Sequence, residues 1–247
     1  MTFKKFSKAL HDAANILGVQ APAIGTSKGK AYEAWIMLEI VVRLQKLGVI
    51  AFPVDHKDAL VSKFEVSGGP ANMPSEASSK GDEPCHFVLA KDRTILELHL
   101  GLKCLGLSDA RHELDIVVID RGAAKQLRQS GGGPYEGLIA AGAELKAYDR
   151  KHKLPHVIPR AMLGIAVDID PGWIMGHFVI RTVGGKERQY TPTRRTYYSL
   201  MTSTRLHDSS AQYLEHHGAG AFSLVAPANC DDAIDAFVER IIEAMDR

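Results

Sequence analysis

Two short segments of the chain carry charged residues whose types and spacing suit metal chemistry. The first is HELDIVVID at 112–120, in which Asp115 precedes four apolar residues. The second is LIAAGAELKAYD at 138–149, in which Glu144 and Lys146 are two residues apart. Residues two apart project from the same face of a strand. If the two segments are neighbouring strands, Asp115, Glu144 and Lys146 converge.

The convergence of two carboxylates has a chemical consequence. Carboxylates forced together repel each other, and one of them tends to stay protonated unless a divalent cation lies between them. Mg²⁺ suits such a site because it prefers hard oxygen ligands and is commonly held by one or two carboxylates and a substrate phosphate. The ammonium group of Lys146 can orient an attacking water and stabilise charge that develops on a phosphate. The pattern therefore predicts metal-assisted hydrolysis of a phosphodiester bond.

Hydrophobic periodicity predicts the elements that must position these residues. Apolar residues at helical spacing, together with capping residues, indicate helices at 3–17, 30–47, 159–167 and after Asp232. Strand-like runs, each bounded by Gly, Asp or Ser, occupy 94–102, 113–119, 138–148 and 173–183. The middle of the chain is therefore expected to contain a helix, three strands, a second helix and a further strand.

The motif and the element order together resemble the PD-(D/E)xK phosphodiesterase superfamily, whose members share the restriction-endonuclease-like fold. The resemblance covers about 30–183 of the chain. The family's first acid maps onto Asp115 and its E-x-K triplet onto 144–146, while Leu114 replaces the nominal proline. The implied fold class is α/β, with a mixed central sheet flanked by helices and extra helices at both ends of the chain.

The resemblance also implies an activity and a role for each motif residue. The expected function is that of a Mg²⁺-dependent endonuclease that hydrolyses DNA, with Mn²⁺ as a substitute metal and RNA as a second polymer that stays open. Asp115 and Glu144 would hold the metal together with the Leu145 carbonyl, and Lys146 would assist the attacking water. Members of the family act in restriction, antiphage defence and DNA repair.

A further acid is expected at the site. In the family, an acid on the helix that precedes the strands often joins the metal ligands, and Glu33 occupies that position here. An acid in a first helical turn is also favoured by the helix dipole alone, so both explanations of Glu33 stay open. Glu97 and Glu113 compete with it as additional ligands.

Two basic segments are candidates for contacts with nucleic acid. Between 181 and 205 there are six basic residues and one acid, interleaved with tyrosines that can stack on bases. A solvated strand face explains that segment equally well. The second basic run directly follows the E-x-K segment, where it can reach phosphates. The predicted DNA contacts are Arg150, Lys151, Lys153, Arg194 and Arg195.

Composition limits the class of protein. The 247 residues are 45% hydrophobic, which is enough for a single domain with a substantial core, and the net charge of +1 excludes a histone-like basic protein. Three widely spaced cysteines argue against a disulfide framework. With no stretch long enough to span a bilayer, we expect a cytoplasmic protein without a membrane partner.

The expected domain organisation is one nuclease-like domain over 1–247. Its core is predicted at about 30–183, interrupted by a surface excursion at 52–85 that is rich in Ser, Gly, Pro and charge. The remainder, 184–247, is predicted to be a C-terminal extension that ends in an amphipathic helix. The acids at 231–232 are typical of a helix N-terminus.

Other motifs fail on their spacing. Gly29-Lys30 and Gly185-Lys186 are not followed by the Ser or Thr that a phosphate-binding loop needs. His112 has Ile116 where a zinc-peptidase helix would have its second histidine.

Two alternatives to the nuclease remain open. One is a catalytically silent nucleic-acid- or protein-binding subunit of a larger defence or repair complex. The other is a different α/β enzyme that acts on a small phosphorylated substrate. A nuclease of this size is expected to work as a homodimer or beside a separately encoded sensor or motor subunit.

Overall fold

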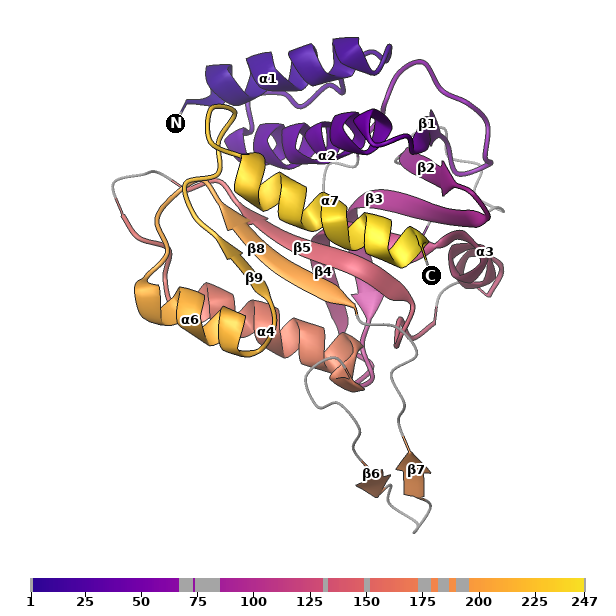
Figure 1. The fold of residues 1–247 in the computed structure, drawn as a ribbon, viewed down its shortest axis with the longest axis vertical. Coiled ribbons are helices and arrows are strands. Elements are labelled where there is room, and N and C mark those ends of the chain that lie inside the picture. The colour runs from indigo at the N-terminus through magenta and orange to yellow at the C-terminus, as the bar shows by residue number, and fades with distance from the viewer. Residues whose placement is uncertain are drawn as a thin grey trace.

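A mixed β-sheet with helices on both faces is the centre of the protein, as the computed structural model shows (Figure 1). The model describes residues 2–66, 73, 85–130, 133–148, 152–172, 179–181, 187–189 and 196–246. The predicted α/β class with a mixed central sheet flanked by helices is confirmed in these residues.

The sheet has seven strands in the order β1-β2-β3-β4-β5-β8-β9. Their bounds are β1 Ile50–Val54, β2 His86–Lys91, β3 Thr94–Leu105, β4 Arg111–Asp120, β5 Ile139–Lys146, β8 Tyr197–Thr202 and β9 Gly220–Phe222. The strands from β1 to β5 pair antiparallel, whereas β5, β8 and β9 pair parallel. The strands β6 (Val179–Arg181) and β7 (Glu187–Gln189) pair antiparallel in a separate two-stranded sheet.

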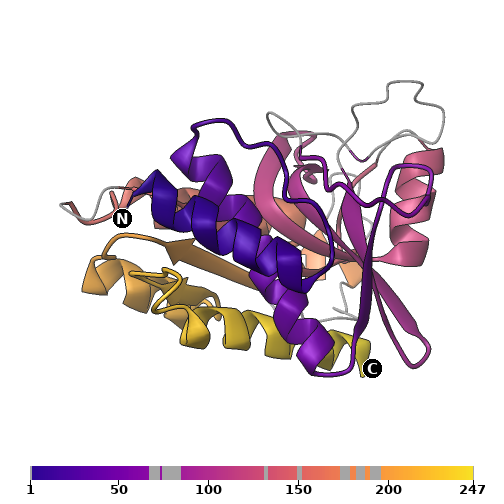
Figure 2. The same ribbon diagram turned by 90° about the horizontal axis from the view of Figure 1, so that it is seen from above.

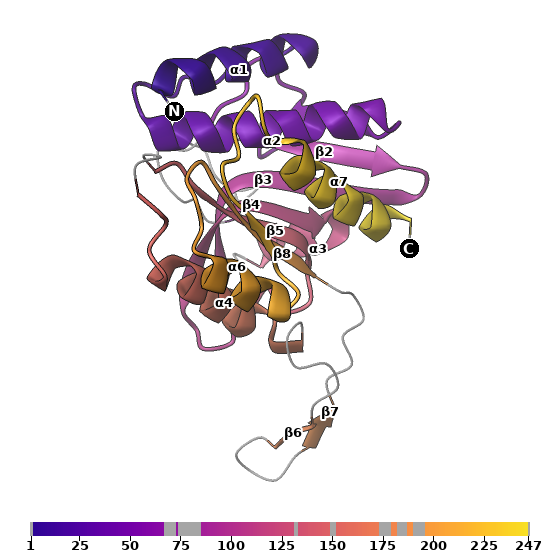
Figure 3. The same ribbon diagram turned by 60° about the vertical axis from the view of Figure 1, so that its left-hand side comes forward.

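One face of the sheet is covered by α1 (Phe3–Ile16), α2 (Lys28–Lys46) and α7 (Asp231–Met245). Figures 1 and 3 show α2 between α1 and α7, and Figure 2 shows the same layer from above, with α1 lying over α2. Phe6 of α1 packs edge-on against Tyr32 and stacks on Trp35 of α2, with ring centroids 5.0 and 5.7 Å apart. Arg43 of α2 forms ion pairs with two aspartates of α7, which fixes these helices relative to each other.

The opposite face carries α3 (Arg121–Gln129), α4 (Val157–Ile169) and α6 (Asp208–His216). Figures 1 and 3 show α4 and α6 side by side. Asp120, the last residue of β4, caps α3 by accepting a hydrogen bond from the Ala123 N–H at 3.1 Å. Leu127, Met162 and Leu214, one from each helix, are buried in the core on this face.

Strands β4 and β5 separate at one end. β4 pairs with β3 along its whole length, to Arg111, but it pairs with β5 only from Ile119 to Ile116. β5 nevertheless continues to Lys146, where its partner is Thr202 of β8. A split therefore opens between β4 and β5 beyond the Ile116 and Ala143 pair.

The predicted helices and the first three predicted strands are all present, with ends shifted by a few residues. The further strand differs from the prediction at 173–183. Residues 173–178 and 182–183 lie outside the described part, and 179–181 pair only with β7. The strand that follows α4 in the sheet is β8, so the sheet extends into the stretch expected to be a C-terminal extension.

The surface excursion predicted at 52–85 also meets the sheet at both ends. β1 includes its first residues, and β2 begins directly after it and pairs with β1. Most of the segment between them, 67–84 except Met73, lies outside the described residues. The sheet therefore has two more strands on the β3 side than the sequence pattern predicted.

A glycine at the centre of the sheet provides a test of this packing. A Cβ atom on Gly142 of β5 would lie 3.1 Å from the Tyr198 ring and 3.2 Å from Leu114. We expect Gly142→Ala to lower the free energy of unfolding by about 1–3 kcal/mol because both neighbours are held in the core. Urea denaturation followed by circular dichroism measures the effect.

The matched control is Gly164→Ala in α4, where the new methyl group meets no atom within 4 Å. That substitution should stabilise the protein by up to about 1 kcal/mol because alanine has the higher helix propensity. Equal stabilities of the two variants would contradict the register of β5 against β8.

Candidate functional site

The split between β4 and β5 brings together the three charged residues of the sequence motif. Lys146 Nζ lies 2.5 Å from Glu144 Oε1 and 3.4 Å from Asp115 Oδ2. The side chains of Asp115, Glu144 and Lys146 are 6, 15 and 28% exposed, respectively. The acids are thus buried from most directions, while the ammonium group reaches solvent.

Leu145 contributes its backbone to the same site. Its N–H donates a hydrogen bond to Asp115 Oδ2 at 2.6 Å, in place of a bond to the backbone of β4. The N–H and C=O groups of one residue point to the same side of a strand. The Leu145 carbonyl therefore faces the split, whereas the carbonyl of Lys146 faces β8 and accepts from the Ser203 N–H at 3.0 Å.

Glu33 approaches the site from the first turns of α2. The helix is capped by Ser27, and Lys28 donates to the Tyr148 carbonyl at 3.0 Å, which ties the start of α2 to the chain just after β5. Glu33 pairs with Lys30 at 2.9 Å. Burial raises the pKa of the Glu33 carboxyl, and the negative charge of Asp115 raises it further. The structure therefore brings Glu33 close to the carboxylates of the split.

The two acids named as rivals of Glu33 lie in different places. Burial and then the charge of Asp115 raise the pKa of Glu113, so this residue belongs to the rim of the site. Glu97 is fully buried and forms hydrogen bonds with both terminal nitrogens of Arg128, at 2.6 and 2.8 Å. Because Arg128 belongs to α3, Glu97 points to the sheet face opposite α2.

Burial and repulsion between the carboxylates shift the pKa values of the groups in this site. Burial, followed by the negative charge of Asp115, raises the pKa of Glu144 to about 7, although Lys146 opposes this. Burial disfavours the charge of Lys146, yet Asp115 and Glu144 together raise the pKa of its ammonium group. The protein thus supplies one positive charge for two acids, with a third acid nearby.

The predicted nucleic-acid contacts are described only in part. Arg150, Lys151, Arg194 and Arg195 lie outside the described residues. Lys153 is exposed, and its backbone forms an isolated parallel β-bridge with the backbone of Arg205. The segment after β5 lies beside the segment after β8, since Ser203 Oγ donates a hydrogen bond to the Tyr148 carbonyl at 2.9 Å. Lys153 is therefore on the segment that leads away from Lys146.

A second group of candidate metal ligands was missed in the sequence. His86, Glu97 and His99 are buried, and one ligand atom from each lies within 4.8 Å of the others, so the group could hold a metal ion. The two-residue spacing of Glu97 and His99 was visible, but the partner His86 is on β2, which the pattern did not predict.

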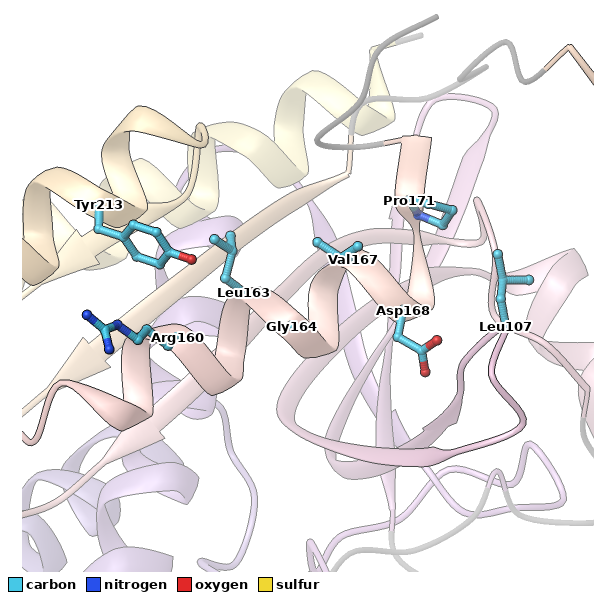
Figure 4. Close-up of a pocket in the computed structure, with 8 residues that line it drawn as sticks. All are labelled: Leu107, Arg160, Leu163, Gly164, Val167, Asp168, Pro171 and Tyr213. Carbon is cyan, nitrogen blue, oxygen red and sulfur yellow. The ribbon is translucent and has the colours of Figure 1, made fainter. Parts of the chain in front are cut away.

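A pocket of about 510 Å³ lies along α4, away from these groups. Figure 4 shows Arg160 and Tyr213 at one end of it and Asp168 with Leu107 at the other. Ser108 Oγ and His112 Nε2 both contact the Asp168 carboxylate, at 2.7 and 2.6 Å. Because the serine and the histidine share the acid, they do not form the serine–histidine–aspartate relay of a hydrolase.

Comparison with known proteins gives no relative. No protein-family model, no curated protein sequence and no solved structure matches the chain. None of the described helices combines the length and the apolar character needed to cross a membrane. The chemistry of the site must therefore be argued from its own geometry.

The raised pKa of Glu144 predicts a pH-dependent stability. In EDTA the folded protein keeps a proton on Glu144 up to pH of about 7, whereas the unfolded chain loses it near 4.5. Stability attributable to this group therefore falls as the pH rises between these values. The free energy of unfolding of Glu144→Gln minus that of wild type should therefore rise by about 3 kcal/mol from pH 4 to pH 8, because only wild type loses this stability. Urea denaturation at both pH values measures the difference.

Adding Mg²⁺ at pH 8 should stabilise wild type more than Glu144→Gln, since a cation favours the ionised carboxylate. Glu239→Gln, on the exposed side of α7, is the control for the loss of a surface carboxylate. A stability difference between wild type and Glu144→Gln that does not change with pH would contradict the buried, acid-paired environment of Glu144.

Proposed function

We propose that the protein is a Mg²⁺-dependent endonuclease that hydrolyses phosphodiester bonds in DNA. The observation that carries the proposal is the convergence of Asp115, Glu144 and Lys146 in the split between β4 and β5. In the resemblance, Asp115 is the family's first acid, and Glu144 and Lys146 are the acid and the lysine of the E-x-K triplet. The proposal includes a role in restriction or antiphage defence, which rests on the resemblance alone.

The element order supports the proposal. The order α2, β3, β4, β5, α4 and β8, which the resemblance to the restriction-endonuclease-like fold implies, is found once the intervening elements are set aside. These are β1 and β2 before β3, α3 between β4 and β5, and β6 and β7 after α4. The acids lie on β4 and β5. We propose that α2, β3, β4, β5, α4 and β8 form a restriction-endonuclease-like core, to which the other described elements are additions: β1, β2, β6, β7, β9, α1, α3, α6 and α7.

The donor set suits Mg²⁺. Asp115, Glu144 and the Leu145 carbonyl offer oxygen atoms toward the same split, and Glu33 adds a fourth oxygen donor from α2. Hard oxygen ligands of this kind are those that Mg²⁺ and Mn²⁺ take. When bound, the ion would supply charge neutralisation for the phosphate and a water of lowered pKa.

The side chains of the protein do the remaining work. The ammonium group of Lys146, which now bridges Glu144 and Asp115, would turn toward the phosphate once a cation neutralises the acids. There it would orient the attacking water and stabilise the negative charge that develops on the phosphate oxygens. The hydrogen bond from the Leu145 N–H fixes Asp115 Oδ2, so the orientation of the carboxylate, and with it of the oxygen that would hold the metal, is set before the substrate binds.

Exposed basic residues near the split bear on the polymer that the protein binds. Lys153 and Arg205 are exposed on the chain segments that continue from β5 and β8, where they can contact phosphates of a bound polymer. DNA is the proposed polymer, and RNA is an outcome that the cleavage assay distinguishes. The three cysteines are buried and unpaired, which agrees with the reducing cytoplasm that we propose as its location.

A second candidate function is a catalytically silent subunit that binds nucleic acid or protein. The observation in its favour is the bridge between Lys146 and both acids, because an ammonium group in contact with both carboxylates offsets part of their repulsion without a metal. In that function the site would be a structural ion-pair cluster. Mg²⁺ binding separates the two candidates.

Cleavage assays test the proposed activity directly. Wild type should cleave plasmid or linear duplex DNA in Mg²⁺ but not in EDTA, and single-stranded DNA and RNA reveal the strand preference. Lys146→Ala should reduce the rate by about 10²-fold or more, because it removes a group that acts in the transition state. Gel electrophoresis of the products over time measures the rate.

The chain contains a matched control in a second D-x-K triplet, Asp55-His56-Lys57, which lies in a turn after β1. Lys57→Ala removes an exposed lysine from the decoy triplet and should cleave at the wild-type rate. Equal activity of Lys146→Ala and wild type would remove Lys146 from the site. If wild type neither cleaves a polymer nor binds Mg²⁺, the silent subunit is the better account.

Lys153 allows a test of DNA binding that does not depend on cleavage. Each phosphate contact contributes about 0.9 to the slope of log affinity against log salt concentration on duplex DNA. Lys153→Ala should therefore weaken binding to all sequences alike and reduce that slope by about one. Fluorescence anisotropy in EDTA at several salt concentrations measures both. An unchanged slope would exclude Lys153 from the DNA surface.

A further inference from the structure

We propose that His86, Glu97 and His99 form a second metal site, which binds a divalent transition metal of the Zn²⁺ class and clamps β2, β3 and α3 together. The three side chains are 0–5% exposed and lie on neighbouring strands. Two imidazoles and a carboxylate are a ligand set that Zn²⁺ takes in proteins, whereas Mg²⁺ favours oxygen ligands alone. This site therefore differs in chemistry from the oxygen-lined split.

The spacing of the ligand atoms fits one ion. Glu97 Oε2 lies 3.0 Å from His99 Nε2 and 3.6 Å from His86 Nε2. Two ligands about 2.1 Å from a tetrahedral ion are about 3.4 Å apart, so both distances are close to the required value. The two imidazole rings are now nearly parallel, at 16°. Rotation about χ2, which is a soft torsion for histidine, would aim both nitrogens at a common point.

His86 is the residue that points to a ligand. Its side chain is 1% exposed, yet neither ring nitrogen has a hydrogen-bond partner among the described residues. Buried polar groups are rarely left in that state, and each exception needs an explanation.

Arg128 sets the orientation of the carboxylate and limits the affinity. It donates to both oxygens of Glu97, which fixes the carboxylate so that Oε2 also faces the two histidines. Outer hydrogen bonds of this kind orient metal ligands. Because Arg128 and Arg121 already pair with Glu97, at 2.6 and 4.0 Å, an added ion brings uncompensated positive charge. We therefore expect weaker binding than at a site with an unpaired carboxylate.

The second site is independent of the proposed catalytic site. Glu97 and His99 face α3, whereas Asp115 faces the α2 side of the sheet. His99 pairs with Val117 of β4, two residues beyond Asp115, a step of roughly 7 Å along the strand. A metal at His86, Glu97 and His99 therefore stabilises the sheet without touching the residues proposed to act on DNA.

Zinc titration of the full chain tests the proposal. The titration uses a background carrying Asp115→Asn and Glu144→Gln, which removes the carboxylates of the split. Isothermal titration with Zn²⁺ should give one equivalent, and Co²⁺ should give the intense visible absorption of a tetrahedral site. His86→Phe should weaken Zn²⁺ binding by more than about 100-fold, because it removes a direct ligand.

Two controls keep the outcome decisive. His86→Phe should fold as wild type does in EDTA, since His86 has no hydrogen bond to lose, and Zn²⁺ should raise the thermal midpoint of wild type but not of this variant. His156→Phe removes the exposed imidazole that stacks on the half-buried His207 and contacts Ser210, and it should leave Zn²⁺ binding unchanged. No Zn²⁺ binding by the background protein, or binding that His86→Phe leaves intact, would overturn the proposal.

Discussion

The repulsion between two buried acids on adjacent strands is the constraint around which this end of the sheet is organised. The ammonium group of Lys146 holds both acids, and the Leu145 N–H donates to Asp115 Oδ2 instead of to the backbone of β4. The split between β4 and β5 makes room for these groups. It also leaves the Leu145 carbonyl free to face the same space, so the distortion of the ladder and the chemistry of the site have a common cause.

Much of this arrangement could be predicted because it depends on local pattern. The apolar runs of β3, β4 and β5 and the stripes of α2 and α7 are long and periodic, so their existence followed from the sequence alone. The E-x-K spacing also placed Glu144 and Lys146 on one strand face. The strand partners could not be predicted in the same way. β2 follows a segment rich in Ser, Gly and charge, and β8 follows a basic stretch, so neither stood out as a sheet strand.

The same limit explains the histidine cluster. Glu97 and His99 share a face of β3 by simple alternation, but what makes them a candidate site is His86 opposite them and Arg128 above them. Those neighbours come from β2 and α3 and are brought close only by tertiary structure. The sequence alone named Glu97 as a possible additional ligand beside Asp115 and Glu144, because it gave no means of telling which face of the sheet the residue occupies.

The outermost strands bear on how the protein meets other chains. An open sheet has two edges, and an unprotected edge can recruit a strand from another molecule. Here Pro53 interrupts the donors of β1, and the chain that follows folds back so that Val61 donates to the Pro53 carbonyl. At the far side, β9 is only three residues long. Within the residues that the structure describes, neither outer strand of the seven-stranded sheet offers a long continuous row of free backbone groups, which protects both edges against edge-to-edge pairing with another sheet.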